Sequence, residues 1–210
     1  MENFKLIKLY TWTTPNGRKI SIALEELGLD YEVQAVDLTQ DQQFSNHFLN
    51  LNPNHKIPAI EDGDQAIWES GAILLYLGET HDPDGRILPR DPARRIEAIQ
   101  YAFFQTGGVG PNLGRFGAAV RKEGEKNNEM IEIFGGEMDR LCGVLDRILA
   151  RDDRRYLVGD YSIGDIMHFP WLRIVQNLGA EWITSRPRVA DWLDRIAARP
   201  AVQRGMAVPE

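Results

Sequence analysis

The sequence predicts an α/β plus all-α chain, in which a domain of element order βαβαββα precedes a helical bundle. Two observations lead to this prediction. Short alternating segments and helix-period segments follow one another up to His81, and beyond Pro92 the apolar residues have helical spacing only. Proline and glycine turns fill the stretch between His81 and Pro92. We therefore expect domains at residues 1–82 and 93–210, with a linker between them.

The first predicted elements form a βαβ unit. Phe4–Tyr10 alternates apolar residues with lysines, which is typical of a strand. Lys19–Leu29 has apolar residues at helical spacing and places Gly28 in the last turn. Tyr31–Asp37 alternates again, so we expect a second strand there.

The rest of the first domain is predicted from shorter segments. We expect a short helix around Phe44–Leu51, then strands at Ile57–Ile60 and Ala66–Trp68 on either side of a turn at Asp62-Gly63. A helix from Ser70 to Glu79 completes the order βαβαββα.

Helices are the only elements predicted in the second part. They are expected near Ala93–Gln105, Asn128–Ala150, Ile163–Leu178 and Arg188–Arg199. The third of these begins with a capping-box variant at Ser162–Asp165, whose role is folding. Its apolar residues are interpreted as core: Met167, Phe169, Trp171, Leu172 and Val175.

Composition excludes several classes of function. The 24 basic and 31 acidic residues give a net charge of −7, with no basic run suited to a phosphate backbone, so we expect no nucleic-acid partner. The absence of a signal-peptide pattern and of a long uncharged apolar run predicts a cytoplasmic protein with no membrane partner. The four histidines have no i, i+4 pair, so we expect no metal and interpret them as surface side chains.

Cysteine usage limits the redox chemistry. Cys142 is the one cysteine of the chain, so an intrachain disulfide or a CxxC pair is excluded and any thiol chemistry needs a borrowed thiol. Because Met138, Leu141 and Leu145 accompany it at helical spacing, we expect Cys142 to be a buried packing residue.

The first candidate site is Thr14-Pro15-Asn16-Gly17, between the first strand and the first helix. It can be a plain loop in which Asn16 caps the helix. Alternatively, the helix N-terminus with Thr14 and Asn16 as donors can stabilise an anion such as a thiolate.

The second candidate site is Ile57-Pro58, where a strand opens with a proline. An ordinary trans proline at a sheet edge explains it. A cis Pro58 would instead leave the backbone of Ile57 free to pair with an extended peptide.

The third candidate site is Glu69-Ser70. Ser70 can simply cap the following helix. In the other interpretation Ser70 and the helix N-terminus hold a ligand carboxylate, and Glu69 pairs with a ligand ammonium group. Glutathione carries a carboxylate, an ammonium group and a thiol on a peptide-like backbone, and would satisfy all three sites.

Over essentially its whole length the chain resembles the glutathione transferase superfamily, and within it the nu class of disulfide-handling members. The resemblance implies a thioredoxin-like first domain and a homodimer. It is carried by these segments: Leu9-Tyr10, Thr14–Gly17, Leu24–Glu26, Val36–Leu38, Gln43-Phe44, Asn52–Asn54, Lys56–Ile60, Glu69–Leu77 and Gly107–Pro111.

The resemblance also implies roles for single residues. Thr14 and Asn16 would be catalytic by holding the glutathione sulfur, and Tyr10 is the rival ligand because other classes use a tyrosine near this position. Gln43 and Ile57 would bind the glutathione backbone. The remaining predicted substrate-binding residues of this domain are Lys56 and Pro58, with Glu69 and Ser70 at the γ-glutamyl end.

The second domain departs from the nu pattern at one place. Glu132 is followed by Ile133, where nu members can carry an arginine that serves glutathione, so Arg115, Arg121 or Lys122 would supply the charge. The glycines from Gly107 to Gly110, with Pro111, are expected to open the long helix. A second-substrate pocket there could be edged by Trp12, Phe103 and Phe116, and packed core is an equal expectation for these aromatics.

The sequence therefore predicts a glutathione-dependent disulfide reductase, with glutathione as cosubstrate and two glutathione molecules, or one glutathione disulfide, per protomer. One alternative is a glutathione transferase or lyase acting on small hydrophobic electrophiles. Another is a non-catalytic glutathione-binding regulatory module.

Overall fold

The computed structural model describes residues 6–122 and 127–209. It divides into two compact units, one reaching Arg90 and resumed from Ala198 onward, the other spanning Asp91–Ala197. The sequence-based boundaries place residues 93–210 in the second domain, whereas the segment from Ala198 onward belongs to the first unit.

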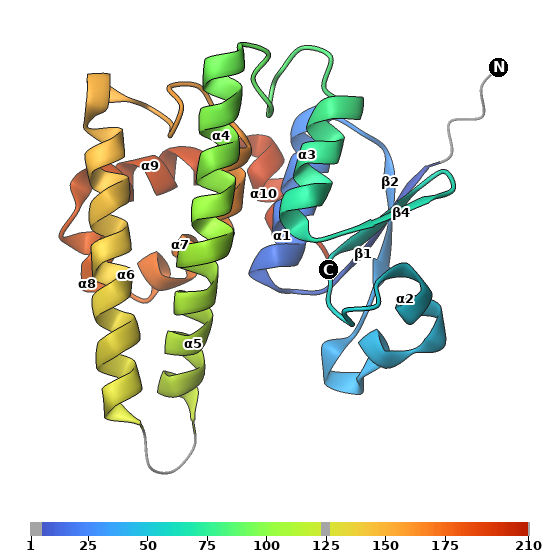
Figure 1. Ribbon diagram of the computed structural model, residues 1–210, viewed down its shortest axis with the longest axis horizontal. Coiled ribbons are helices and arrows are strands. Elements are labelled where there is room, and N and C mark those ends of the chain that lie inside the picture. The colour runs from blue at the N-terminus through green and yellow to red at the C-terminus, as the bar shows by residue number, and fades with distance from the viewer. Residues whose placement is uncertain (1–5, 123–126, 210) are drawn as a thin grey trace. The chain divides into compact units, whose positions relative to one another are not determined.

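The first unit has the predicted order βαβαββα (Figure 1). Phe4, the expected start of the first strand, lies outside the described residues. The elements are β1 (Ile7–Thr11), α1 (Pro15–Leu27), β2 (Tyr31–Ala35), η1 (Leu38–Gln40), η2 (Gln42–Phe44), α2 (Asn46–Leu51), β3 (Ala59–Asp62), β4 (Gln65–Trp68) and α3 (Ser70–Thr80).

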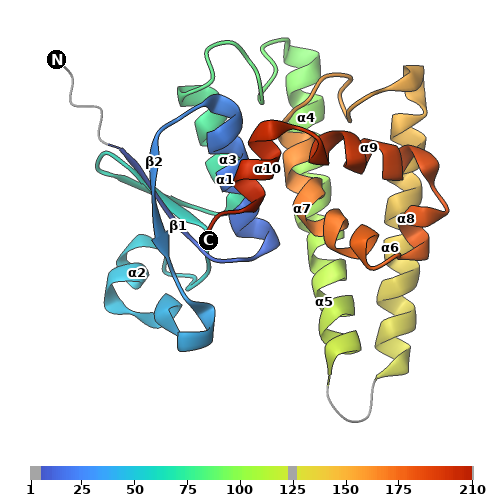
Figure 2. The same ribbon diagram turned by 180° about the vertical axis from the view of Figure 1, so that it is seen from behind.

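The described strands form one sheet in the order β2-β1-β3-β4, with β1 and β2 parallel and the other two pairs antiparallel. Helices α1 and α3 pack on each other at one face of the sheet, and α2 lies at the other (Figures 1 and 2). Gly28 ends α1 in the left-handed region, at φ 68°, which a glycine adopts without steric cost. It therefore follows the last turn of the helix.

The last helix, α10 (Pro200–Met206), packs against α1 (Figure 2). The Ser21 hydroxyl donates to the Gly205 carbonyl oxygen at 2.6 Å, and a Cβ on Gly205 would lie 2.6 Å from Ile22 Cα. Arg199 forms two hydrogen bonds with the Glu26 carboxylate, at 2.6 and 2.7 Å. These contacts fix the C-terminal segment to the first unit.

The regular elements in the described residues of the second unit are helices, and one isolated β-bridge joins Val158 to Asp160. The elements of the unit are α4 (Pro92–Phe104), η3 (Gln105–Val109), α5 (Gly110–Arg121), α6 (Asn128–Leu149), η4 (Arg151–Asp153), α7 (Ile163–Asn177), α8 (Glu181–Thr184) and α9 (Pro187–Ala197). The expected helix at Arg188–Arg199 corresponds to α9, which begins at Pro187 and ends at Ala197, and Pro200 begins a separate helix, α10.

The glycine-rich segment does not break the helix as expected. Residues 105–109 adopt a π-helical turn that joins α4 to α5, and Pro111 occupies the first turn of α5. Proline lacks an amide hydrogen, so it is tolerated where the ladder is already widened. The Asn112 side-chain amide donates to the Gly108 carbonyl oxygen at 2.9 Å and satisfies an acceptor of this turn.

The capping box of α7 is present. Ser162 accepts from the Gly164 amide, and the Asp165 carboxylate accepts from the Ser162 amide at 2.9 Å and from Trp192 Nε1 at 2.8 Å. The predicted core residues of α7 are buried, except that Trp171 is half-buried. None of the helices within residues 6–122 and 127–209 combines the length and apolar character that a bilayer crossing requires.

Candidate active site

The register of the sheet brings the three predicted motifs to one end of the first unit. Tyr10 lies opposite Ala59, and Ala59 lies opposite Trp68. The segment after β1, the segment before β3 and the segment after β4 therefore emerge at the same edge. Ala35 lies opposite Thr11, so the chain that leads from β2 to η2 emerges there too.

The width of this edge fits a short peptide. Neighbouring strands are about 4.8 Å apart, so the ends of β1 and β4, separated by β3, are about 10 Å apart. An extended tripeptide is about 10 Å long. A ligand of that length can reach from the start of α1 to the start of α3.

The start of α1 is built around Thr14. Thr14 is the N-cap, with its hydroxyl oxygen accepting from the Gly17 amide at 3.3 Å, and Pro15 and Asn16 follow inside the first turn. The expectation that Asn16 caps the helix was therefore wrong. A Cβ on Gly17 would collide with Thr11 Oγ1 and would lie 2.7 Å from the Trp12 carbonyl oxygen, which explains the glycine.

This turn can stabilise an anion. The Thr14 hydroxyl uses an oxygen lone pair to accept from Gly17, so its O–H remains a donor. The helix N-terminus adds the positive end of the helix dipole. Thr14 and Asn16 are both half-buried, which strengthens such interactions relative to bulk water.

Tyr10 has another role. It is 5% exposed and its hydroxyl donates to the Glu61 carboxylate at 2.5 Å, with His47 Nε2 at 3.3 Å. Burial and the neighbouring Glu61 carboxylate raise the pKa of Tyr10 above its usual value. Its ring packs in a cluster with Phe48 and Val36, so this geometry favours a structural tyrosine over a sulfur ligand.

The second motif contains a cis peptide bond between Ile57 and Pro58, directly before β3. Both residues are buried, while Lys56 is exposed. The loop before them is held by Asn52, whose side-chain amide donates to the Lys56 carbonyl oxygen at 2.6 Å and whose Oδ1 accepts from the Asn54 amide at 2.9 Å. The backbone of Ile57 thus lies in an anchored segment at the edge of the site.

Gln43 and His55 have buried polar atoms in the same unit. Gln43 donates to Asp41 at 3.4 Å, and its Oε1 has no hydrogen-bond partner among the described residues. The His55 ring lies 5.2 Å from that of Phe44, and its Nδ1 likewise has none within the described chain. Gln43 Oε1 can accept from a ligand amide. His55 was expected at the surface and is half-buried.

At the third motif the helix cap is Glu69, not Ser70. Glu69 has φ 71°, and α3 receives no side-chain capping hydrogen bond from it. Such a left-handed conformation costs a non-glycine residue about 1–3 kcal/mol and is typical of functional sites. Ser70 is the first helical residue and is buried, so its hydroxyl does not have the capping role considered for it.

The structure adds Lys19, which the sequence reasoning treated only as the start of a helix. Lys19 is 1% exposed, and its Nζ donates to Ser70 Oγ at 3.4 Å. Burial lowers the pKa of Lys19 to about 7, with a smaller opposing effect from Glu69. Its place beside Ile20, Ile22 and other apolar residues was the available signal in the sequence.

In the second unit the predicted binding residues Arg115 and Arg121 are both exposed on α5. The Arg115 guanidinium lies 5.8 Å from the centre of the Phe134 ring. Arg121 folds back along its helix, since a Cβ on Gly117 would be 2.9 Å from its Nη1. Ile133 is 58% exposed on α6.

The three aromatic residues considered for a pocket have different surroundings. Phe103 is 68% exposed, and Phe116 contacts Trp182 edge-on at 4.8 Å. Trp12 is partly buried against the cluster that contains Tyr10.

Cysteine and histidine side chains were also candidates for thiol and metal chemistry. Cys142 is fully buried, and burial raises the pKa of its thiol to about 12. Over the residues that the structure describes, His, Cys, Asp and Glu side chains form no group of three that could hold a metal ion. His168 is buried against Gly164 and Trp192, and so differs from the expected surface side chain.

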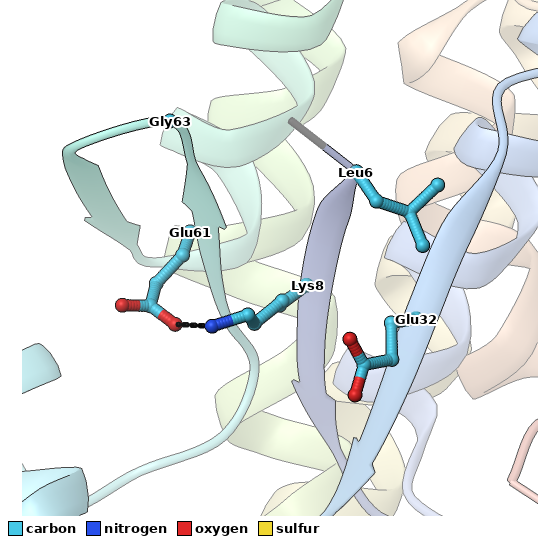
Figure 3. A pocket seen from close by; sticks show the side chains of 5 residues that line it. All are labelled: Leu6, Lys8, Glu32, Glu61 and Gly63. Carbon is cyan, nitrogen blue, oxygen red and sulfur yellow. Dashed lines mark hydrogen bonds and ion pairs between the residues drawn. The ribbon is translucent and has the colours of Figure 1, made fainter. Parts of the chain in front are cut away.

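A pocket of about 260 Å³ lies at the opposite end of the sheet (Figure 3). It is lined by Leu6, Lys8, Glu32, Glu61 and Gly63, and Lys8 pairs with Glu61 at 3.4 Å. This pocket lies at the Gly63 turn, away from the three motifs.

The fold and the arrangement of these motifs match a known family. Residues 6–79 match the glutathione S-transferase N-terminal domain and residues 101–200 match the glutathione S-transferase C-terminal domain. The chain belongs to the glutathione S-transferase family.

Individual relatives are similar over nearly the full chain. The disulfide-bond oxidoreductase YfcG of Escherichia coli strain K12 is 37% identical over 209 residues, covering 96% of this chain and 94% of YfcG. A glutathione transferase homologue from Lodderomyces elongisporus, solved with two glutathione molecules per subunit, superposes with a TM-score of 0.92 at 37% identity, covering 98% of this chain and all of that one. A glutathione transferase from Pseudomonas putida, solved with one glutathione disulfide per subunit, gives a TM-score of 0.88 at 38% identity. The match covers 100% of this chain and 94% of the Pseudomonas chain.

Proposed function

We propose that the protein is a glutathione-dependent disulfide-bond reductase. The observation that carries the proposal is the contrast between two places in the chain. The Thr14 turn offers donors to a thiolate at the edge of the sheet, whereas the thiol of Cys142 is buried and has a raised pKa. The reacting sulfur must then come from a bound thiol, and the likeness to YfcG supports glutathione and disulfide chemistry.

The first step is attack by the glutathione thiolate on one sulfur of a disulfide. A new S–S bond forms between glutathione and that sulfur, the substrate S–S bond breaks, and the leaving thiolate takes a proton from water. A second glutathione thiolate then attacks the glutathione sulfur of the mixed disulfide. Glutathione disulfide and the second substrate thiol leave. Two glutathiones lose two electrons, and one disulfide gains them.

Thr14 and Asn16 have the catalytic role in this scheme. Their donors, with the N-terminus of α1, lower the pKa of the bound thiol from its ordinary value near 8.5. A decrease by about two units requires about 2.7 kcal/mol, which two or three hydrogen bonds to a charged sulfur can supply.

The remaining residues of the first unit hold the tripeptide. We assign the glutathione backbone to the Ile57 peptide group beside Pro58 and to the unpartnered Oε1 of Gln43. The exposed Lys56 ammonium suits the glycine carboxylate. Glu69 pairs with the γ-glutamyl ammonium group, and Ser70 with the start of α3 binds the γ-glutamyl carboxylate.

We also propose that each protomer accepts two glutathiones or one glutathione disulfide. The relatives solved with those ligands support this. The second tripeptide brings two more carboxylates, and Arg115 and Arg121 are exposed cations of the second unit that can pair with them. A nu-class assignment, a cytoplasmic location and a homodimer remain part of the proposal, on the resemblance of the sequence motifs.

Two assays and two variants test the function. We expect turnover of a small hydroxyalkyl disulfide by glutathione to exceed conjugation of an aryl halide. Thr14→Ala and Asn16→Ala should each lower kcat/KM for the disulfide by about ten to a thousand fold and raise the pKa of bound glutathione, read from thiolate absorbance.

The matched control is Asn127→Ala. Asn127 caps α6 by accepting from the Met130 amide at 3.0 Å, so its loss costs a comparable helix cap, about 1 kcal/mol, without touching the thiol. An unshifted thiolate titration in both Thr14 and Asn16 variants would reject the sulfur site. Efficient conjugation without disulfide turnover would favour the transferase or lyase alternative, and glutathione binding without either activity would favour the regulatory module.

A further inference from the structure

Lys19 is a buried cation next to the proposed glutathione site. Its side chain lies in the interior of the first unit, and its ammonium group is 3.4 Å from Ser70 Oγ. Lysine is rarely buried to this extent, because removing the ammonium group from water is costly unless it is paired or loses its proton. The function proposed so far does not use it.

The position of Lys19 connects the two ends of the site. It follows Thr14 and Asn16 on α1 by about one helical turn, and its head group reaches the first residue of α3. Both helices belong to the same unit and pack on each other. Lys19 thus joins the helix start assigned to the sulfur with the helix start assigned to the γ-glutamyl carboxylate.

The Glu69 carboxylate acts on Lys19. It opposes the effect of burial on the lysine pKa. Charged and titratable groups on the elements that pack against α1 have partners of their own. Near α10, Arg199 pairs with Glu26 and Arg204 with Glu25, both on α1. Tyr76 of α3 donates to Asp62, and Lys8 and Tyr10 of β1 pair with Glu61. Glu79 is a further carboxylate on α3. A carboxylate arriving at Ser70 would therefore add a second negative charge close to Lys19.

We propose that Lys19 is a positioning residue for the γ-glutamyl end of glutathione, acting through Ser70, and that its proton is coupled to occupancy of that site. The inference rests on the proposed binding of glutathione at Glu69 and Ser70.

The hydrogen bond from Lys19 to Ser70 orients the Ser70 hydroxyl toward the ligand. An ammonium group can only donate, so it occupies a lone pair of Ser70 Oγ and leaves the serine proton to donate to the ligand carboxylate. The positive charge of Lys19 also attracts the ligand carboxylate, and the burial of Lys19 and Ser70 strengthens this attraction. Both effects need Lys19 in its protonated form.

The affinity for glutathione should fall as pH rises through the range in which Lys19 loses its proton. Burial places the pKa of Lys19 near 7 in the free protein, and a bound carboxylate raises it because an opposite charge favours the ammonium form. Affinity is therefore highest below about pH 7, where Lys19 is charged before binding, and falls as pH rises toward the pKa of the bound state. Between the two pKa values, binding takes up a proton.

Calorimetry with S-methylglutathione tests this directly. This ligand has no ionisable thiol, so release of the thiol proton does not mask the uptake. Titrations at about pH 7.5 in buffers of different ionisation enthalpy should give an uptake of about half a proton for the native protein. Its affinity should fall about sixfold between about pH 6.5 and 8.5, if binding raises the lysine pKa by one unit.

Lys19→Met keeps an unbranched apolar stem and removes the charge. We expect this variant to be no less stable without ligand, because no ammonium group has to be buried. It should bind S-methylglutathione about eightfold more weakly near pH 6.5, with little pH dependence and no proton uptake. The control is Lys8→Met, which removes an exposed lysine paired with Glu61 and should keep the native profile.

The outcomes separate the inference from the function on which it rests. Equal affinity and equal proton uptake in Lys19→Met and the native protein would overturn the role of Lys19. A native protein that binds with no proton uptake would overturn it without any variant. A native protein that does not bind S-methylglutathione at any pH would instead reject the proposed glutathione site.

Discussion

Replacing Cys142 tests whether the reacting sulfur is borrowed. Cys142 lies on α6 with no exposed surface, among the buried residues Met138, Leu141 and Leu145. Burial raises the pKa of its thiol to about 12, against a partial lowering by Arg186. At about pH 7.5 the thiolate fraction is then about 3 in 100,000, and the sulfur is also inaccessible to a disulfide.

The expected result of Cys142→Ala is retained turnover with a small loss of stability. kcat/KM for a hydroxyalkyl disulfide with glutathione should stay within about twofold of the native value. The free energy of unfolding, from urea denaturation, should fall by about 1 kcal/mol because a sulfur atom is lost from a packed core. Cys142→Ser should retain turnover too, at a greater cost of about 1–3 kcal/mol for a buried hydroxyl.

A more than tenfold loss of disulfide turnover in a Cys142→Ala protein that folds with the expected stability would refute the reasoning. The protein's own thiol would then take part in the reaction. Alkylation of Cys142 by iodoacetamide is a second test. In the native protein it should occur only at the rate of local or global unfolding, and rapid labelling would contradict the burial of Cys142.

Two further predictions concern Tyr10 and the arginines of α5. Tyr10→Phe removes the donor to Glu61 and should lower the free energy of unfolding, measured in urea, by about 1–3 kcal/mol. The thiolate absorbance titration of bound glutathione should stay unchanged. A rise of about one unit in the pKa of the glutathione thiol would make Tyr10 the sulfur ligand. Arg115→Ala or Arg121→Ala should weaken the second glutathione more than the first in calorimetric titrations, with Arg140→Ala, an exposed arginine paired with Glu137, as control. A single glutathione site together with no binding of the disulfide form would reject the paired-ligand proposal.

The local order of the chain could be predicted because it is encoded by short-range periodicity. Alternation with period two marks Ile7–Thr11, and spacing near 3.6 marks Asn128–Leu149, whatever the rest of the chain does. The capping box at Ser162 and Asp165 spans four residues and is confirmed for the same reason. The burial of Cys142 also followed from its apolar neighbours at helical spacing.

Local chemistry was ambiguous where neighbouring residues compete for one role. Thr14 and Asn16 are both good helix caps, and in the folded chain Thr14 takes this role while Gly17 fits closely against Thr11 and Trp12. A glycine-rich segment before a proline suits either a break or a π-helical turn. In the structure residues 105–109 form a π-helical turn that continues from α4 into α5.

The sequence by itself determined the family, the element order and the three motifs of the candidate site. The tertiary structure decided which side chains meet. Lys19 and Ser70 are 51 residues apart, Tyr10 and Glu61 are also 51 apart, and Ser21 and Gly205 are 184 apart. Burial and pairing at such separations depend on how sheet register and helix packing close the chain, and no local pattern encodes them. The lysine near Ser70 and the placement of α10 against α1 could therefore be found only in the folded molecule.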